Sequence, residues 1–219
     1  NTIQNKILSM INSAMPAILI LLLIGALSGT WMLSGVIPTM IYYGIKLMSP
    51  SFFLIASVII CSIVSVATGS SWSTIATVGV AIIGIGNAFN MNPSIVAGAV
   101  ISGAYFGDKM SPLSDTTNLA SAIAGTDIFT HIRYLLYTTT PTYIITLIIF
   151  GIIGLWYHNT GNITDTDSIL SGIGNTFHVS PWLFLVPVLL AFIIIKKVPP
   201  VPAMLAGIGL GILFALIFQ

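Results

Sequence analysis

Long apolar runs dominate the pattern of hydrophobic and polar residues along the chain. A helix that crosses the hydrocarbon layer needs about 20 consecutive apolar residues. Stretches of that kind are found at residues 14–33, 134–156 and 201–218. Residues 18–27 are apolar at every position, which differs from the alternation of a membrane-barrel strand. Helices are then the remaining structure that can pair the backbone N–H and C=O groups in lipid. We therefore predict an all-α polytopic membrane protein.

Shorter apolar segments alternate with polar interruptions in the first two thirds of the chain. Residues 1–15 have apolar positions at helical spacing with Lys6 on the other face, which predicts an interfacial lead-in to a first crossing at about 16–31. The segment 36–48 is short enough to be either a tilted span or a re-entrant piece. Further helical segments are expected at residues 52–67, 75–86 and 94–106. None of them is long, so we expect discontinuous helices.

The composition agrees with a membrane protein and excludes other classes. Hydrophobic residues make up 56% of the chain and charged residues 5%, and the mean hydropathy is +1.06. A net charge of +1 offers no basic surface to nucleic acid. The single cysteine, Cys61, lies in an apolar run, so we expect it to pack rather than to form a disulfide.

We expect residues 1–219 to form a single transmembrane domain with lipid as its main partner, and a homo-oligomer is compatible with this pattern. The chain begins at Asn1 and ends after an apolar span, so we expect a fragment of a longer transporter-like chain. Basic residues near span ends favour the cytoplasmic side, which predicts that side for Arg133, Lys196 and Lys197. The segment 158–180 has no Lys or Arg and is predicted to be an extracytoplasmic loop.

Small residues and tryptophans predict helix contacts and membrane anchors. Glycines four residues apart let helices approach closely in lipid, and they occur at Gly25 and Gly29, Gly103 and Gly107, and Gly207 and Gly211. Tryptophans near span ends are expected to lie at the membrane interface, and these are Trp31, Trp156 and Trp182, whereas Trp72 stands beside a polar interruption. Asp127 precedes a helical run and is predicted to cap it.

The candidate chemistry is concentrated around Asp108 and Asp115. An ionised aspartate at bilayer depth costs about 2.5 to 3.5 kcal/mol on insertion scales, so each calls for a partner or a purpose. Pro112 prevents one continuous helix between them. We predict a helix that ends near Asp108, an irregular stretch, and a new helix capped by Ser114 or Asp115.

The oxygen atoms in this segment suit a hard cation. With freed backbone carbonyls, the candidate ligands beside the two aspartates are Ser111, Ser114, Thr116, Thr117 and Asn118. Zinc and copper prefer imidazole or thiolate ligands, and the three histidines, His131, His158 and His178, have no ligand spacing. The chain contains no glutamate, so a titrating carboxylate must be an aspartate.

A second polar interruption lies in the sequence TGSSWST, residues 68–74. The residues predicted to break the helix there are Gly69, Ser70, Ser71 and Ser73. Such a break is tolerated at membrane depth only where it lines a cavity or is buried in protein. Two broken helices that face each other form the binding site of many secondary transporters. The sequence does not show that these two breaks meet.

Each functional interpretation has a simpler competitor. Asp108 and Lys109 could form an interfacial ion pair at a helix end. Asp115 could be a plain helix cap, and the serines of residues 70–73 could bond carbonyls one turn back. If the site binds an ion, Lys109 would modulate it by lowering the carboxylate affinity for protons or by competing for the empty site.

Three stretches carry a family resemblance: residues 98–141, which include YFGDKMSPLSDTTNL, residues 29–50, and residues 68–86. They closely resemble the NhaC family of sodium/proton antiporters, and the likeness covers residues 14–157. The resemblance implies a cytoplasmic-membrane antiporter of the ion transporter superfamily, built from two inverted repeats with interrupted helices. Na⁺ and H⁺ would then compete for the aspartates during alternating access, and no cofactor is implied.

The resemblance leaves the substrate open, because some relatives exchange organic anions such as malate and lactate. An intramembrane aspartyl protease is a remote alternative: its pattern needs a glycine two residues before the Gly-Asp pair, where this chain has Tyr105. A passive channel needs only carbonyl oxygens, so it does not explain a titratable carboxylate.

Overall fold

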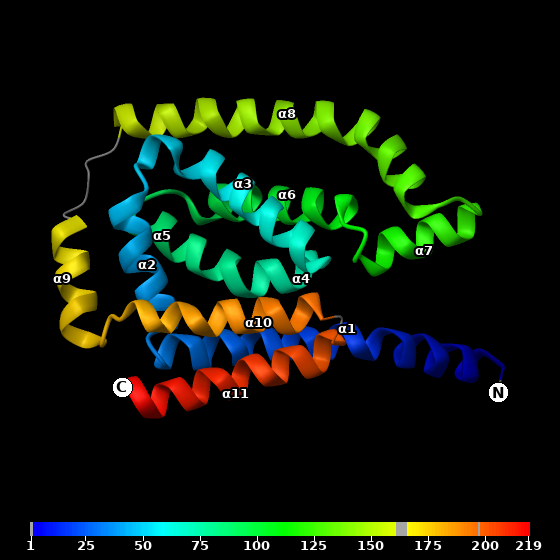
Figure 1. The fold of residues 1–219 in the computed structure, drawn as a ribbon, viewed down its shortest axis with the longest axis horizontal. Helices are drawn as coiled ribbons and strands as arrows, with labels where there is room; N and C mark the ends of the chain where they lie inside the picture. The colour runs from blue at the N-terminus through cyan, green and yellow to red at the C-terminus, as the bar shows by residue number, and fades with distance from the viewer. Residues whose placement is uncertain (1, 161–165, 197) are drawn as a thin grey trace.

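The computed structural model describes residues 2–160, 166–196 and 198–219, and these residues form helices joined by short connections (Figure 1). The first seven elements in chain order are α1 (Thr2–Leu33), α2 (Val36–Leu47), α3 (Pro50–Thr68), α4 (Ser71–Thr74), the π-helix η1 (Ile75–Gly79), α5 (Val80–Ala88) and α6 (Pro93–Met110). They are followed by α7 (Asp115–Ala124), α8 (Ile128–Thr160), α9 (Thr166–Thr176), the 3₁₀-helix η2 (Pro181–Phe184), α10 (Leu185–Ile195) and α11 (Pro200–Phe218).

Four of the described helical segments are long and apolar enough to cross a membrane. They are Pro50–Thr68, Ser71–Ala88, Ile128–Tyr157 and Val201–Phe218. Two bent pairs could add two spans, and one of them joins Ile18–Leu33 to Val36–Leu47 at an angle of 72°. The prediction of an all-α polytopic membrane protein is confirmed. The segment left open at residues 36–48 is a helix that turns away from the preceding one.

Helices α3 and α6 form the centre of the molecule and run parallel. Gly103 faces the backbone carbonyl of Val58, and Gly107, one turn later, faces that of Ser62. Because residue numbers rise together along both helices, their C-terminal ends lie at the same end of the bundle. The glycines allow this approach, since they present no side chain to the neighbouring backbone. Helix α5 lies beside this pair, as Figure 1 shows.

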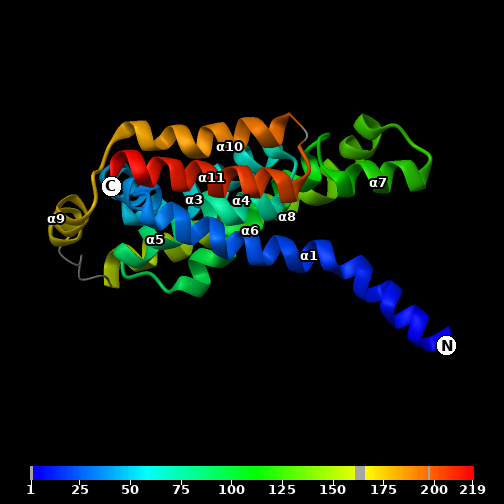
Figure 2. The ribbon, with the colours of Figure 1, turned by 90° about the horizontal axis from the view of Figure 1, so that it is seen from below.

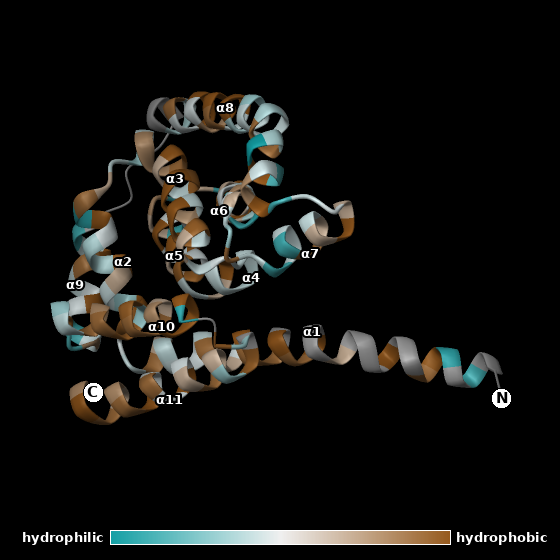
Figure 3. Cartoon of the chain, turned by 45° about the vertical axis from the view of Figure 1, so that its right-hand side comes forward, coloured by the Kyte–Doolittle hydropathy of each residue, from teal (hydrophilic) through white to brown (hydrophobic). Residues whose placement is uncertain are grey.

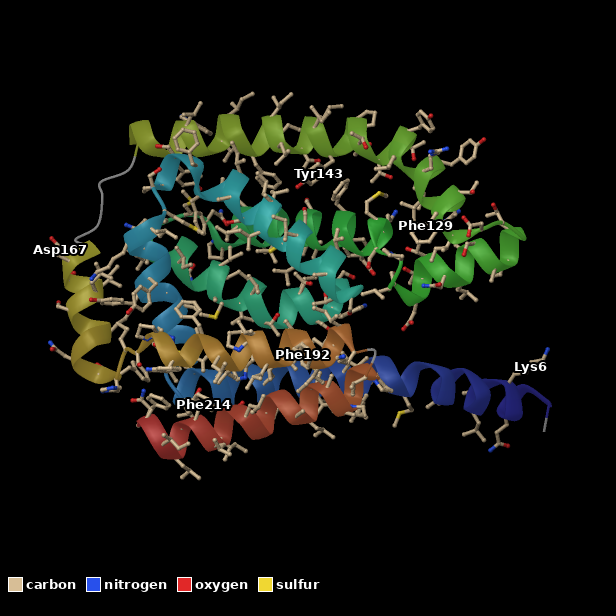
Figure 4. The ribbon with its side chains drawn as sticks, in the orientation of Figure 1. Lys6, Phe129, Tyr143, Asp167, Phe192 and Phe214 are labelled. Carbon is tan, nitrogen blue, oxygen red and sulfur yellow. The ribbon has the colours of Figure 1, made fainter. Side chains whose placement is uncertain are left out.

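Helix α8 packs along α3 in the opposite direction. Gly154 faces the Ser51 carbonyl, whereas Tyr143, three turns earlier in α8, shares a 2.9 Å hydrogen bond with the Ser62 hydroxyl. The Tyr143 ring also stacks on Phe106 of α6 with 3.9 Å between ring centroids. Figure 4 shows Tyr143 on the side of α8 that faces α3 and α6. One side chain therefore ties α8 to both central helices.

A second group of helices, α1, α10 and α11, covers the other side of the molecule (Figures 1 and 2). Gly207 and Gly211 of α11 contact Leu27, Thr30 and Trp31 of α1, as their spacing predicts. Trp31 is 1% exposed and its Nε1 donates to the Gly207 carbonyl at 3.1 Å. The prediction that Trp31 anchors the membrane interface is wrong, because its ring fills the contact between the two helices.

The predicted helix contact at Gly25 and Gly29 and the predicted helix cap at Asp127 have different outcomes. A Cβ added at Gly25 or Gly29 would meet no atom within 4 Å, so this glycine pair mediates no helix contact within the described residues. Asp127 caps α8 as predicted, because its Oδ2 accepts from the backbone N–H groups of Phe129 and Thr130 at 3.0 and 3.1 Å. Capping depends on local geometry, whereas a helix contact needs a partner that the glycines do not specify.

The described core consists of two clusters that correspond to these two helix groups. One cluster lies among α2, α3, α5 and α6 and includes fully buried Cys61, so the packing role predicted for this cysteine is confirmed. The other cluster joins α1, α2, η2, α10 and α11. Figure 3 shows how the apolar residues continue along the outward faces of α10 and α11, as expected for helices in lipid.

The segment predicted as a loop, residues 158–180, contains a helix. Helix α8 continues to Thr160, and α9 occupies Thr166–Thr176 before η2 begins at Pro181. Residues 161–165 lie outside the described residues. The side of the membrane on which this segment lies stays a prediction.

The close contact of α3 and α6 leads to a first testable prediction. In Gly103→Ala the added methyl group would overlap the Val58 carbonyl and force the two helices apart, at a cost of about 1 to 3 kcal/mol. We expect a lower thermal unfolding midpoint for the purified full-length protein. The matched control is Gly98→Ala on the same helix, where the new Cβ would lie 3.6 Å from Phe150 Cζ, an ordinary contact. Equal midpoints for the two variants would contradict the prediction.

Candidate functional site

The polar interruption within residues 68–74 is a sharp turn of two residues between α3 and α4. Gly69 has φ +69° and ψ +23°, a left-handed conformation that ends α3. Ser70 is extended and its Oγ accepts from Ser73 N at 3.3 Å, so it caps the following helix. Ser71 and Ser73 were predicted to belong to the break, and this is wrong: both lie within α4, because the cap lets the helix restart at Ser71.

The interruption between α6 and α7 agrees closely with the prediction from the sequence. Helix α6 ends at Met110, two residues beyond Asp108, and Ser111 adopts an extended conformation before Pro112. Ser114 caps α7 by accepting from Thr117 N at 3.5 Å, and Asp115 is the first helical residue. The predicted sequence of helix, irregular stretch and capped helix is confirmed.

The two interruptions meet at one end of the α3–α6 pair. Ser111 Oγ donates to the Val66 carbonyl at 2.7 Å, and a Cβ on Gly69 would lie 2.7 Å from the carbonyl carbon of Leu113. Ser71 Oγ donates to Asp108 Oδ2 at 3.0 Å. The parallel arrangement of α3 and α6 explains this meeting, because it brings the C-terminal ends of both helices together.

A cavity of about 550 Å³ lies where the interruptions meet. Its polar wall consists of Thr68, Gly69, Ser70, Ser73, Asp108, Ser114, Asp115, Thr116 and Asn118. Its apolar wall consists of Ile20, Trp72, Leu113, Ile194, Val198, Pro199 and Met204. Residues from both helix groups therefore enclose one space, with the polar side supplied by the two breaks.

The two aspartates differ in their surroundings. Asp108 is half-buried and receives the Ser71 hydrogen bond, whereas Asp115 is exposed on the first turn of α7. Within the described part of the chain, Lys109 makes no ion pair with Asp108; its side chain is exposed and does not line the cavity. The competing explanation of Asp108 as half of an interfacial ion pair with Lys109 therefore finds no support in the structure.

The other residues predicted to bind an ion divide into two groups. Ser114, Thr116 and Asn118 line the cavity. Ser111 and Thr117 are buried beside it and do not line it. The Thr117 hydroxyl bonds the Asp108 and Lys109 carbonyls at 3.3 and 3.2 Å, so it holds the end of α6 to α7.

Sequence reasoning omitted two threonines at the turn. Thr68 ends α3 and lines the cavity, and Thr74 ends α4 with its side chain fully buried. Their hydroxyl oxygens lie 3.4 Å apart. Both belong to the polar run TGSSWST, so a candidate list that included every hydroxyl of this run would have contained them.

A π-helical turn follows the site directly. Residues Ile75–Gly79 form this turn between α4 and α5. Such turns are rare and often occur at functional sites, because the widened turn interrupts the regular α-helical hydrogen bonds. Thr77 Oγ1 donates to the Ser73 carbonyl at 2.8 Å and supports this turn from within.

The arrangement suits the binding of a small cation or of a proton. A carboxylate that is half removed from water, with hydroxyl and carbonyl oxygens around it, offers the hard ligands that a cation such as Na⁺ prefers. The same carboxylate can take up a proton. One carboxylate could therefore bind either a cation or a proton, and exchange of the two ions requires such a group.

Comparison with known proteins gives several long matches. A malate-2H⁺/Na⁺-lactate antiporter of Bacillus subtilis is 44% identical over 218 residues, which cover 99% of this chain and 47% of the relative. The Na⁺/H⁺ antiporter NhaC of Alkalihalophilus pseudofirmus is 42% identical over 219 residues, 100% of this chain and 47% of the relative. NhaC of Bacillus subtilis is 41% identical over 217 residues, 98% of this chain and 48% of the relative.

The chain spans about half the length of the curated relatives that it matches. No solved structure matches it. The family model described as the Na⁺/H⁺ antiporter family matches residues 103–219, which begin on α6 and include Asp108, α7 and all later helices. The resemblance to NhaC proteins expected from residues 98–141 is confirmed, and the chain belongs to the Na⁺/H⁺ antiporter family.

Proposed function

We propose that the full-length protein exchanges Na⁺ for H⁺ across the cytoplasmic membrane, with Asp108 as the group that carries either ion. The observation that supports this most directly is the position of the Asp108 carboxylate. It lies half-buried where two helix interruptions meet, beside a cavity lined with hydroxyl groups. An aspartate at such a place lowers stability, so its presence favours a functional role. Family membership supports the same activity.

The mechanism that fits this site is competition. When Asp108 is ionised, sodium neutralises it and occupies the oxygen-lined cavity; when a proton binds the carboxylate, the attraction for sodium is lost. Movement of one helix group against the other then exposes the site to each side in turn. Asp115 lines the same cavity, so a second carboxyl group lies beside the space that the ion would occupy.

A second candidate is exchange of an organic anion together with sodium and protons. The cavity of about 550 Å³ lies within the size range of small-molecule pockets and is far larger than one sodium ion needs. The relative that is 44% identical is named as a malate-2H⁺/Na⁺-lactate antiporter. The N-terminal turn of the ten-residue helix α7 lies beside this space and could receive a carboxylate.

We also propose a multi-pass location in the cytoplasmic membrane with the basic ends of the spans inside. Lys109 lies near the C-terminal end of α6 and Arg133 near the N-terminal end of the antiparallel α8, so both lie at the same end of the helix bundle, as the positive-inside rule expects. Lys46 precedes α3 and lies at the opposite end. Helix α8 has a large apolar surface, and only 6% of its most apolar 18-residue stretch is buried within this chain. A second copy of the chain could cover this surface in a homo-oligomer. The remainder of the full-length protein is another partner for that surface.

Replacing Asp108 by Asn should abolish exchange. The amide keeps the size of the side chain and can still accept from Ser71, but it carries neither a charge nor an exchangeable proton. The measurement is sodium-dependent proton flux per inserted molecule of full-length protein in vesicles. Asp127→Asn is the control, because asparagine caps a helix as well as aspartate does. Normal flux by Asp108→Asn, or equal loss by both variants, would remove Asp108 from the proposed role.

Asp115→Asn tests the second carboxylate in the same assay. We expect it also to lose exchange, because the Asp115 side chain lines the cavity that the ion would occupy. The change leaves the cap of α7 intact, since Ser114 supplies it. Flux at the wild-type level would show that Asp115 acts only as the first residue of α7.

The two candidate functions differ in whether proton flux requires an organic anion in addition to sodium. In vesicles with an acid-loaded lumen, sodium added outside should raise the lumen pH without any organic anion present. Proton flux is read from a pH-sensitive dye, with potassium chloride at the same ionic strength as the control. If the lumen pH rises only when malate or lactate is also supplied, the organic-anion exchanger is the correct function.

A further inference from the structure

The hydroxyl groups around the site differ in the quality of their hydrogen bonds. Those that hold helices together make short bonds: Ser65 Oγ donates to the Ala104 carbonyl at 2.6 Å and Ser111 Oγ to Val66 at 2.7 Å. Thr77 Oγ1, one turn beyond the site, donates at 2.8 Å. Hydroxyl donors in proteins prefer distances of about 2.7 to 2.8 Å. These three groups are therefore satisfied by the protein itself.

Two hydroxyls at the turn between α3 and α4, those of Thr68 and Ser73, make only longer hydrogen bonds. Thr68 Oγ1 lies 3.5 Å from the Ser65 carbonyl, 3.5 Å from the Ser70 carbonyl and 3.4 Å from Thr74 Oγ1. Ser73 Oγ lies 3.2 Å from Ser70 Oγ. Thr68 is only 7% exposed, and it lines the cavity. A buried hydroxyl without a good partner destabilises the folded protein.

The spacing of these oxygens suits the coordination sphere of a small cation. Hard cations of this size hold oxygen ligands at about 2.3 to 2.6 Å, so two ligands at right angles lie about 3.3 to 3.7 Å apart. The distances from Thr68 Oγ1 to Thr74 Oγ1 and to the Ser70 carbonyl fall in this range. The third distance is shorter: Thr74 Oγ1 donates to the Ser70 carbonyl at 2.9 Å. That bond uses the Thr74 hydrogen and leaves the oxygen lone pairs available.

We propose that the transported monovalent cation binds at this turn, with Thr68 Oγ1, Thr74 Oγ1 and the Ser70 carbonyl as ligands. This inference rests on the proposed exchange function and names its cation site. The site differs from the segment between Asp108 and Asn118, which the sequence favoured. Asp108 supplies the compensating charge from the facing break, where Ser71, the neighbour of Ser70, holds its carboxylate at 3.0 Å.

The division of tasks explains why two breaks are needed. The turn after α3 supplies neutral oxygens at a cation-sized spacing, and the end of α6 supplies the negative charge. A proton on Asp108 removes that charge without changing the oxygens. The cation then loses affinity although its neutral ligands remain in place, so the charge of Asp108 couples the two ions.

Direct binding of ²²Na⁺ to the purified full-length protein tests the proposal without relying on transport. Thr68→Val removes the hydroxyl and keeps the shape, and we expect it to weaken sodium binding about tenfold or more. Thr74→Val should act similarly, and Thr68→Ser should restore binding. Thr77→Val is the matched control, because Thr77 is also 7% exposed and its hydroxyl bonds the protein; its sodium affinity should remain within about twofold of wild type.

The outcomes separate this site from the exchange function. Wild-type sodium affinity in Thr68→Val and Thr74→Val, equal weakening by Thr77→Val, or absence of sodium binding by the wild type would each overturn the site. The pattern of weakening by both valine variants and recovery in Thr68→Ser supports it, provided that their thermal unfolding midpoints match that of Thr77→Val. If this pattern occurs while sodium drives no proton flux, the cation site stands and the proposed exchange function fails.

Discussion

In lipid, an unpaired backbone group is too costly to leave exposed, and this constraint governs the structure around residues 69 and 112. Both interruptions free N–H and C=O groups at the ends of apolar helices. Each is covered by the other: Ser111 bonds the Val66 carbonyl, and Leu113 lies against Gly69. Neither break would be stable alone. The polar site that lines the cavity is therefore a consequence of how the backbone groups of the two breaks find hydrogen-bond partners.

This mutual cover depends on the parallel contact of α3 and α6. Gly103 and Gly107 let the two backbones approach, and the approach aligns the C-terminal end of one helix with that of the other. Tyr143 fixes α8 to both of them through one hydrogen bond and one stacked ring. The position of the Asp108 carboxylate therefore depends on helix contacts as far as Gly103, about one and a half turns before it on α6. Packing, rather than local sequence, sets the geometry of the site.

Local signals allowed much of this to be predicted. Pro112 and Ser114 determine where one helix ends and the next begins, because both act on the adjacent backbone. The meeting of the two breaks was beyond prediction, since it depends on which helices pair. The same limitation explains Trp31 and Gly25, whose roles depend on whether a neighbouring helix is present. Ser71 and Ser73 were misassigned because serine permits a helix once another residue has capped it.

The bond from Ser111 to Val66 also has a consequence for biosynthesis. Its partners are 45 residues apart in the chain. At about 5 to 20 residues per second, the ribosome makes Ser111 roughly 2 to 9 seconds after Val66. During this interval the turn after α3 has no cover and relies on bonds within itself, such as that from Thr74 Oγ1 to the Ser70 carbonyl. The site therefore cannot be complete until this interval has passed and α6 has been made.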